Sequence, residues 1–210
     1  MAPAGVDVVV ARTLSRPSGN VPEALQRAVA RLCEASVDVI AYASTTTGYA
    51  IGRAAEVELV ERLRQRSNVP VVTSGIAATQ ALRAFGVRRV AGVHPPWFDD
   101  EMSDLGAAYF RGQGFDVAVS TAASIPKDPE QVRPEHVIDW GSSHVDASTE
   151  AIFIAGNGFR AAQAIETLEY RTGQLVLEAN QVLLYSILAA TRTTLPIDGY
   201  GKLLRVNAPW

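Results

Sequence analysis

The chain has 210 residues, of which 48% are hydrophobic and 20% charged, and this composition predicts a globular protein with a substantial core. Its formal net charge is −3 with acids and bases interleaved, which argues against nucleic acid and membrane as partners and favours a small molecule. No apolar run reaches the ~20 residues of a membrane helix, and segment 1–5 lacks a secretion signal, so we expect a cytoplasmic protein.

Short β-branched runs alternate with helical stretches along the chain, a pattern typical of βαβ units and a parallel sheet. Strands are expected at 6–11, 37–43, 69–73, 89–93, 115–120, 151–155 and 175–177, and helices at 22–35, 54–66, 76–85, 99–113, 129–140, 160–170 and 180–192. Several strands are apolar at consecutive positions, which indicates sheets covered on both faces. The sequence therefore predicts an α/β fold, with the tail 193–210 packed on it as a strap.

Cys33 is the only cysteine. It lies beside Leu32 in a predicted amphipathic helix, so we interpret it as a core residue rather than a reactive thiol. A single cysteine excludes a disulfide within the chain, and no group of His, Cys, Asp and Glu has the spacing of metal ligands. We therefore expect no metal site.

Two segments share one pattern, in which a buried strand runs into a small polar loop with glycine and then into an alanine-rich helix. They are 71–82 and 153–165, and a third polar loop, 44–49, also follows an apolar strand. Glycine lets backbone N–H groups approach a ligand, and helix N-termini attract anions. We expect a carboxylate or phosphate to be bound by Ser44, Thr45, Thr46, Ser74, Gly75, Ile76, Gly156, Asn157 and Gly158; the alternative is that these glycines only allow tight turns.

Three residues that can exchange protons lie next to these loops. His94 ends an apolar strand, so we expect it on the cleft rim beside Trp97 and Phe98, either as a proton carrier or bonded to a loop carbonyl. Glu178 ends the last strand, where it either complements the next helix dipole or faces an apolar pocket as an acid–base group with a raised pKa. Tyr49 is a candidate donor to a developing oxyanion. Glu178, His94 and Tyr49 are the candidate catalytic residues.

At these positions the sequence resembles the aspartate/glutamate racemase superfamily, and within it the branch of maleate cis–trans isomerases and arylmalonate decarboxylases. The most specific likeness lies in segments 70–90 and 152–160, followed by Asn180-Gln181. The resemblance implies two pseudo-symmetric flavodoxin-like halves with parallel sheets, a substrate cleft between them and no cofactor. We accordingly expect 1–88 with 178–210 to form one half and 89–177 the other, in one compact unit that lacks the family's first strand. A homo-oligomer is left open.

The resemblance also implies two catalytic cysteines, where this sequence has Gly75 and Gly156. Glycine cannot carry a proton, so the thiol mechanisms are unavailable, and we expect extra room in the cleft, with both glycines at helix N-termini facing it. The predicted function is thiol-independent acid–base chemistry on a small carboxylic acid, of isomerase or lyase type with an enolate-like or oxyanion intermediate, or a diverged reaction such as cyclisation or dehydration. The alternative is a non-catalytic binding or regulatory protein.

Overall fold

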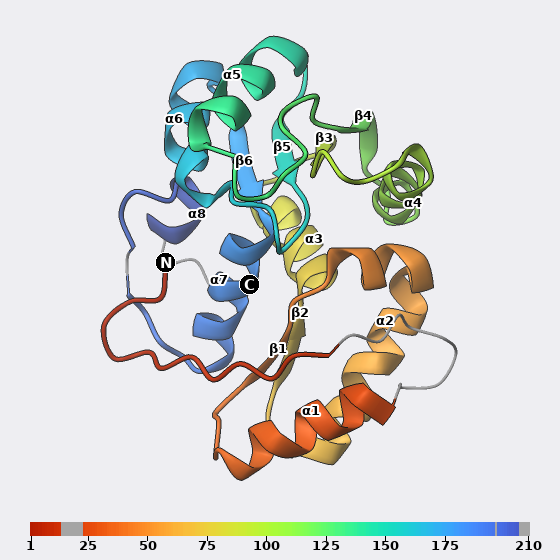
Figure 1. Ribbon diagram of the computed structural model, residues 1–210, viewed down its shortest axis with the longest axis vertical. Coiled ribbons are helices and arrows are strands. Elements are labelled where there is room, and N and C mark those ends of the chain that lie inside the picture. Colours follow the sequence, from red (N-terminus) through yellow and green to blue (C-terminus); the bar gives the residue numbers. More distant parts are fainter. Residues whose placement is uncertain (14–22, 196, 206–210) are drawn as a thin grey trace.

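The computed structural model describes residues 1–13, 23–195 and 197–205, and it contains two parallel sheets (Figure 1). The smaller sheet pairs β1 (Ile40–Tyr42) with β2 (Val71–Thr73). The larger has the order β4-β3-β5-β6, formed by β3 (Arg89–His94), β4 (Asp116–Ala122), β5 (Ala151–Ile154) and β6 (Leu175–Glu178). All of these pairs are parallel, which confirms the predicted α/β class.

Helices connect the strands and cover both sheets. They are α1 (Glu23–Glu34), α2 (Thr45–Ser67), α3 (Ser74–Ala84), α4 (Asp100–Arg111), α5 (Pro134–His144), the 3-10 turn η1 (Ala162–Ala164), α6 (Ile165–Thr172), α7 (Ala179–Ala190) and α8 (Lys202–Arg205). In the described part of the chain, none is long and apolar enough to cross a membrane. Residue 22 of the first expected helix, and residues 196 and 206–210 of the expected strap, lie outside the described residues.

Strands β3, β5 and β6 of the larger sheet are buried on both faces, whereas the edge strand β4 is mostly half-buried. On β5, Phe153 belongs to a core cluster shared with α3, α4 and α7, whereas its neighbours Ile152 and Ile154 belong to a second cluster shared with α5 and α6. Successive side chains of a strand point to opposite faces, so a strand covered on both sides is apolar throughout. This confirms the interpretation of the continuous apolar run. The expected division into 1–88 with 178–210 and 89–177 stays a prediction.

The expected strand at 6–11 is wrong, because this segment pairs with no strand of the described chain. Val8 and Val10 are 67% and 71% exposed, and Val9 between them is also exposed. A strand of a packed sheet buries at least one of its two alternating faces, and here both faces lie open. The β-branched run therefore satisfies strand propensity without finding a partner.

Three helix starts differ from their expected positions, for local reasons. α2 begins at Thr45, because Ser44 caps it, and not at 54. α5 begins at Pro134, since proline suits the first position of a helix and disrupts later ones. The expected helix at 160–170 is a 3-10 turn from Ala162 followed by α6 from Ile165.

The prediction that Cys33 is a core residue is also wrong, because its side chain is exposed. The first two turns of α1 bury Leu25, Ala28 and Val29 against β1 and α2. This contact surface ends at the last turn, where only Leu32 remains partly covered. The amphipathic pattern continues there without a neighbour to bury it.

We predict that iodoacetamide alkylates Cys33 in the folded protein, since an exposed thiol needs no unfolding to react. Intact-mass spectrometry under native conditions should show one adduct per chain, and the Cys33→Ser variant should show none. A requirement for denaturant before the adduct forms would contradict the exposed position.

Candidate functional site

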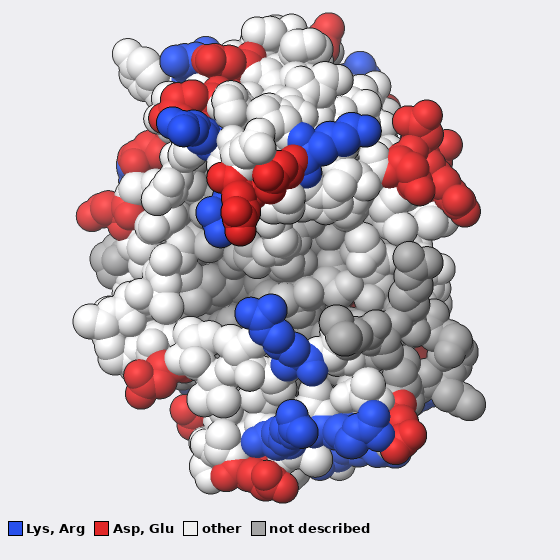
Figure 2. All heavy atoms as spheres, in the orientation of Figure 1, with Lys and Arg blue, Asp and Glu red and all other residues white. Residues whose placement is uncertain are grey.

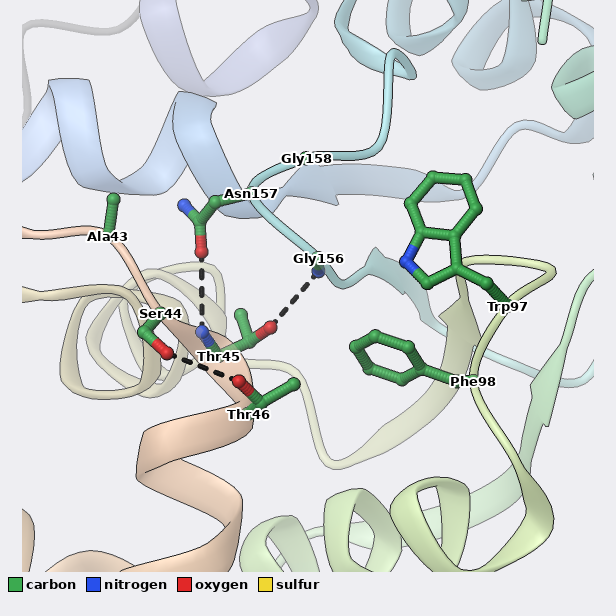
Figure 3. Close-up of a pocket in the computed structure, with 9 residues that line it drawn as sticks. All are labelled: Ala43, Ser44, Thr45, Thr46, Trp97, Phe98, Gly156, Asn157 and Gly158. Atoms are coloured by element: carbon green, nitrogen blue, oxygen red, sulfur yellow. Dashed lines mark hydrogen bonds between the residues drawn. The ribbon is translucent and has the colours of Figure 1, made fainter. Parts of the chain in front are cut away.

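A pocket of about 170 Å³ lies between the start of α2 and the loop after β5 (Figure 3). Its lining residues are Ala43, Ser44, Thr45, Thr46, Trp97, Phe98, Gly156, Asn157 and Gly158. No side chain in this lining is ionisable. Charged side chains gather instead above and below the hollowed middle of the face drawn in Figure 2. The pocket therefore offers hydrogen-bond donors and aromatic surface, and no charge of its own.

One wall of the pocket is the first turn of α2. Ser44 has extended backbone angles, and its Oγ accepts the N–H of Thr47 at 3.2 Å, as expected of an N-cap. The same Oγ lies 3.2 Å from the hydroxyl of Thr46 and 2.7 Å from that of Thr47. This run of hydroxyl residues thus ends the strand segment, begins the helix and lines the pocket.

The opposite wall is the loop after β5, where Gly156 has a φ of +89°. A Cβ at this position would lie 2.3 Å from Pro95 Cγ, and side chains rarely adopt such a φ. The N–H of Gly156 donates to Thr45 Oγ1 at 3.1 Å across the pocket. Because the loop continues to Ala161 before η1, the expectation that Gly156 opens a helix is wrong.

Asn157 joins the two walls to a third segment. Its Oδ1 accepts the N–H of Thr45 at 3.3 Å and the hydroxyl of Ser74 at 3.1 Å. Its Nδ2 donates to Asn180 Oδ1 at 2.9 Å, and Asn180 Nδ2 donates to Glu178 Oε1 at 2.9 Å. A directed chain of hydrogen bonds therefore runs from the start of α2 to the start of α7.

Backbone donors remain available after these bonds are counted. In the described part of the chain, the N–H groups of Thr46, Asn157 and Gly158 donate to no protein acceptor. Thr46 belongs to the first turn of a helix, where N–H groups have no partner within the helix. Unpaired N–H groups beside a helix N-terminus suit an anion such as a carboxylate.

The expected binding residues divide into two groups. Ser44, Thr45, Thr46, Gly156, Asn157 and Gly158 line the pocket. Ser74 lies one step behind and is bonded to Asn157, while Gly75 and Ile76 are absent from the lining.

The expected extra room at Gly75 is wrong. A Cβ at Gly75 would lie 2.9 Å from Glu56 Oε1 and 2.7 Å from the hydroxyl oxygen of Tyr109. These two side chains occupy the space that the absent side chain leaves. At Gly156 the equivalent space is filled by the Pro95 ring.

Sequence reasoning missed Glu56, which is a buried carboxylate. A signal was present, because Glu56, Leu59 and Leu63 have the spacing of one helix face and all three are buried. An acidic residue in an otherwise apolar stripe is a reason to look for hydrogen-bond partners.

Glu178 is fully buried and takes the helix-capping role, whereas its role as an acid–base group stays a prediction. Its Oε2 caps α7 by accepting the N–H groups of Asn180 at 2.9 Å and Gln181 at 3.0 Å. Burial raises the pKa of this carboxyl to about 7, although its hydrogen bonds act in the opposite direction. At neutral pH this carboxyl therefore holds a proton more readily than an exposed glutamate does.

His94 is fully buried, so its expected place on the cleft rim is wrong. The Phe98 ring stacks on it with the centroids 5.8 Å apart. On its other side α4 approaches closely at Gly106, where a Cβ would lie 2.9 Å from the imidazole Cε1. The aromatic neighbour was expected, but it covers the histidine instead of lying beside it.

The tautomer of His94 follows from its neighbours. Ser120 Oγ lies 2.8 Å from His94 Nε2 and donates its own proton to the carbonyl of Ser103 at 2.7 Å. Nε2 must therefore carry the hydrogen, and the buried lone pair of Nδ1 has no partner within the described parts of the chain. Burial lowers the pKa of His94 to about 4, so the ring is neutral at pH 7.

Tyr49, the third candidate, is buried with its ring edge toward His94, at a centroid distance of 5.8 Å. Its hydroxyl has no hydrogen-bond partner among the residues that the structure describes. Burial raises the pKa of Tyr49, with Tyr109 and Glu56 adding to the effect, so the phenol keeps its proton. Among the described residues, no group of three or more His, Cys, Asp and Glu could hold a metal ion.

The family profile of arylmalonate decarboxylase matches residues 11–204, most of the chain. The chain belongs to the arylmalonate decarboxylase family. Maleate isomerase of Pseudomonas putida KT2440 is 28% identical over 190 residues, which cover 85% of this chain and 74% of that protein. These matches confirm the resemblance to this branch of the racemase superfamily. The two named proteins are enzymes, and this member of the arylmalonate decarboxylase family is likewise an enzyme of isomerase or lyase type.

Solved structures in the arylmalonate decarboxylase family and its branch share the fold. Maleate isomerase of Pseudomonas putida S16 superposes with a TM-score of 0.79 at 26% identity, over 85% of this chain and 75% of that one. Arylmalonate decarboxylase itself superposes with a TM-score of 0.79 at 20% identity, over 87% of this chain and 81% of that one, a similarity of fold alone.

We predict that Gly156→Ala lowers the free energy of unfolding by about 2–4 kcal/mol, because the new Cβ meets Pro95 and the φ is unfavourable. Gly158→Ala is the matched control: no atom lies within 4 Å of its added Cβ, and its effect should stay within about 0.5 kcal/mol. Urea denaturation followed by tryptophan fluorescence measures both. Equal stabilities of the two variants would contradict the close packing of Gly156 on Pro95.

Proposed function

We propose that this protein is a cofactor-independent isomerase or lyase that binds a small carboxylic acid in the pocket between 44–46 and 156–158. The observation that carries this proposal is the set of unpaired N–H groups at Thr46, Asn157 and Gly158, in a lining that holds no acidic side chain to repel an anion. The relatives support it by their own substrates: maleate isomerase of Pseudomonas putida S16 was solved with maleate, and the family bears the name of arylmalonates.

The pocket also indicates where the rest of the substrate lies. Trp97 and Phe98 form an aromatic wall opposite the hydroxyl residues of α2 (Figure 3). One carboxylate on the N–H groups, with an apolar substituent against the aromatic rings, is the arrangement that satisfies both walls.

Proton transfer is assigned to the groups directly behind this lining, because the lining itself has no acid or base. We keep Glu178, His94 and Tyr49 as the proposed catalytic residues: a carboxyl with a pKa of about 7, a neutral imidazole with a free Nδ1 lone pair, and a phenol with a free proton. In an enolate-like intermediate, negative charge grows on the substrate carboxylate, where the N–H groups stabilise it. A cyclisation or dehydration could use the same groups.

The activity can be tested by proton NMR in D₂O, with maleate and phenylmalonate as probes and EDTA present. We expect conversion of at least one acid, with deuterium incorporated at the carbon next to the carboxylate. Cys33→Ser is the control and should convert the same acid at the same rate, because the chemistry needs no thiol. Absence of both conversion and deuterium exchange, at protein and probe concentrations high enough to detect weak binding, would overturn the proposal.

Glu178 gives a second test through pH. Its pKa rises from 4.5 in the unfolded chain to about 7 in the fold, so the folded protein retains a proton that the unfolded chain has lost. The stability contributed by Glu178 is thus complete below about pH 4.5 and is lost as the pH rises to about 7, a change of about 3 kcal/mol.

We predict that Glu178→Gln removes this pH dependence while keeping an oxygen to cap α7. Urea denaturation between pH 4 and 8 should show the wild type losing about 3 kcal/mol relative to the variant across that range. The variant should also lose the limb of the pH–rate profile near pH 7. Parallel stability curves for the two proteins would show that Glu178 does not titrate there.

A further inference from the structure

A buried carboxylate lies behind the two helix starts that border the pocket. Glu56 is only 2% exposed, and its Oε1 accepts the hydroxyl of Thr73 at 2.6 Å while its Oε2 accepts the hydroxyl of Tyr109. No lysine or arginine among the described residues forms an ion pair with it. A buried carboxyl group that forms no ion pair needs other polar groups to stabilise it.

A break in α2 brings this carboxylate into place. Gly52, inside the helix, has φ 75° and ψ 167°, which no helical residue adopts. In an unbroken helix, residues eight apart lie about 12 Å apart along the axis. Yet Glu56 Oε1 is 3.1 Å from where a Cβ of Gly48 would lie. The break at Gly52 bends α2, so that the side chain of Glu56 in the second part of the helix reaches back to Gly48 in its first turn.

Both helix starts are built around this one side chain. Gly48 lies in the first turn of α2 and Gly75 in the first turn of α3, and a Cβ on either would press on the Glu56 carboxylate, at 3.1 Å and 2.9 Å. Helix N-termini carry partial positive charge, so both suit the carboxyl oxygens of Glu56, as do the two hydroxyl groups that donate to them.

The helix starts connect Glu56 to the pocket. Thr73 is the N-cap residue of α3, but its hydroxyl bonds to Glu56 and not to its own helix. The next residue, Ser74, donates to Asn157 Oδ1 on the pocket wall. On the other helix, Thr46 shares the first turn of α2 with Gly48.

We propose that Glu56 is a positioning residue, which fixes the first turns of α2 and α3 and through them the N–H of Thr46 and the amide of Asn157. Its role in turnover rests on the proposed function, whereas its hold on the two helix starts requires no substrate. Glu56 touches no pocket-lining residue directly by hydrogen bond, so it acts through Thr73, Ser74 and the α2 turn.

Hydrogen-exchange mass spectrometry of the unliganded protein tests the hold on the helix starts. Glu56→Ala should speed exchange about tenfold or more in peptides covering 45–48 and 74–77. Without Glu56, local opening breaks fewer hydrogen bonds and therefore requires less free energy. Glu56→Gln, which keeps an acceptor for Thr73, should restore most of the protection. The matched control is Glu169→Gln: this buried glutamate accepts the N–H groups of Val176 and Lys202, so exchange should rise there and not at 45–48.

Thr73→Val is a second variant in case Glu56→Ala fails to fold. It removes one hydroxyl at nearly constant volume, and its effect should be confined to 74–77 because Tyr109 and the α2 turn keep their contacts with Glu56. The proposal would be overturned if Thr73→Val exchanged at the wild-type rate in 74–77. It would also be overturned if a folded Glu56→Ala variant exchanged at the wild-type rate at both helix starts.

Kinetics separates this inference from the proposed function. With maleate or phenylmalonate, whichever the wild type converts, Glu56→Ala and Thr73→Val should raise KM about tenfold and leave the shape of the pH–rate profile unchanged, because misplaced binding groups weaken substrate binding without removing a titrating group. An unchanged KM would overturn the role in turnover. If the wild type converts neither acid but exchange responds as expected, the proposed function fails and the positioning by Glu56 stands.

Discussion

The site depends on the hydrogen bonds of the Asn157 carboxamide, because they join the starts of three helices, α2, α3 and α7. The backbone N–H of Thr45 can only donate a hydrogen bond. The side-chain oxygen of Asn157 must therefore face α2, and its side-chain nitrogen must face Asn180. Asn180 is thereby fixed in turn, with its own nitrogen toward Glu178. One backbone N–H therefore fixes the donor–acceptor direction of this whole series of hydrogen bonds, which ends at the buried carboxyl group of Glu178.

Close packing governs the positions where the family resemblance predicted catalytic cysteines. At Gly75 and Gly156 the missing side chains leave no void, since Glu56, Tyr109 and Pro95 fill the space. Protein interiors seldom retain cavities, and a neighbouring side chain that fills one gains dispersion contacts that an empty space would forgo. Glycine at these two positions therefore makes room for neighbouring side chains, and the pocket stays small because those side chains fill the space.

Ionisable groups surround the pocket without entering it. Glu178, Glu56 and His94 are all buried, and none of them belongs to the lining. Burial disfavours the charged forms of Glu178 and His94 and brings both toward neutrality at physiological pH. In the proposed function, the lining presents an uncharged surface to the anionic substrate, and the proposed proton-exchanging groups lie behind it. This arrangement differs from a site in which the acid and base contact the ligand directly.

Local sequence pattern determined the strands of both sheets, the burial of β5 on both faces, the polar run of Ser44, Thr45 and Thr46 that lines the pocket, and the family. Periodicity, turn chemistry and motif residues are properties of neighbouring positions, so the sequence shows them directly. Tertiary structure alone decided that Cys33 is exposed, that segment 6–11 is unpaired, that Phe98 covers His94 and that Glu56 fills the space at Gly75. All but the contact between Phe98 and His94, which are four positions apart, depend on a segment distant in the chain. The sequence specifies such contacts only through the whole fold, as between Thr45 and Gly156, 111 positions apart.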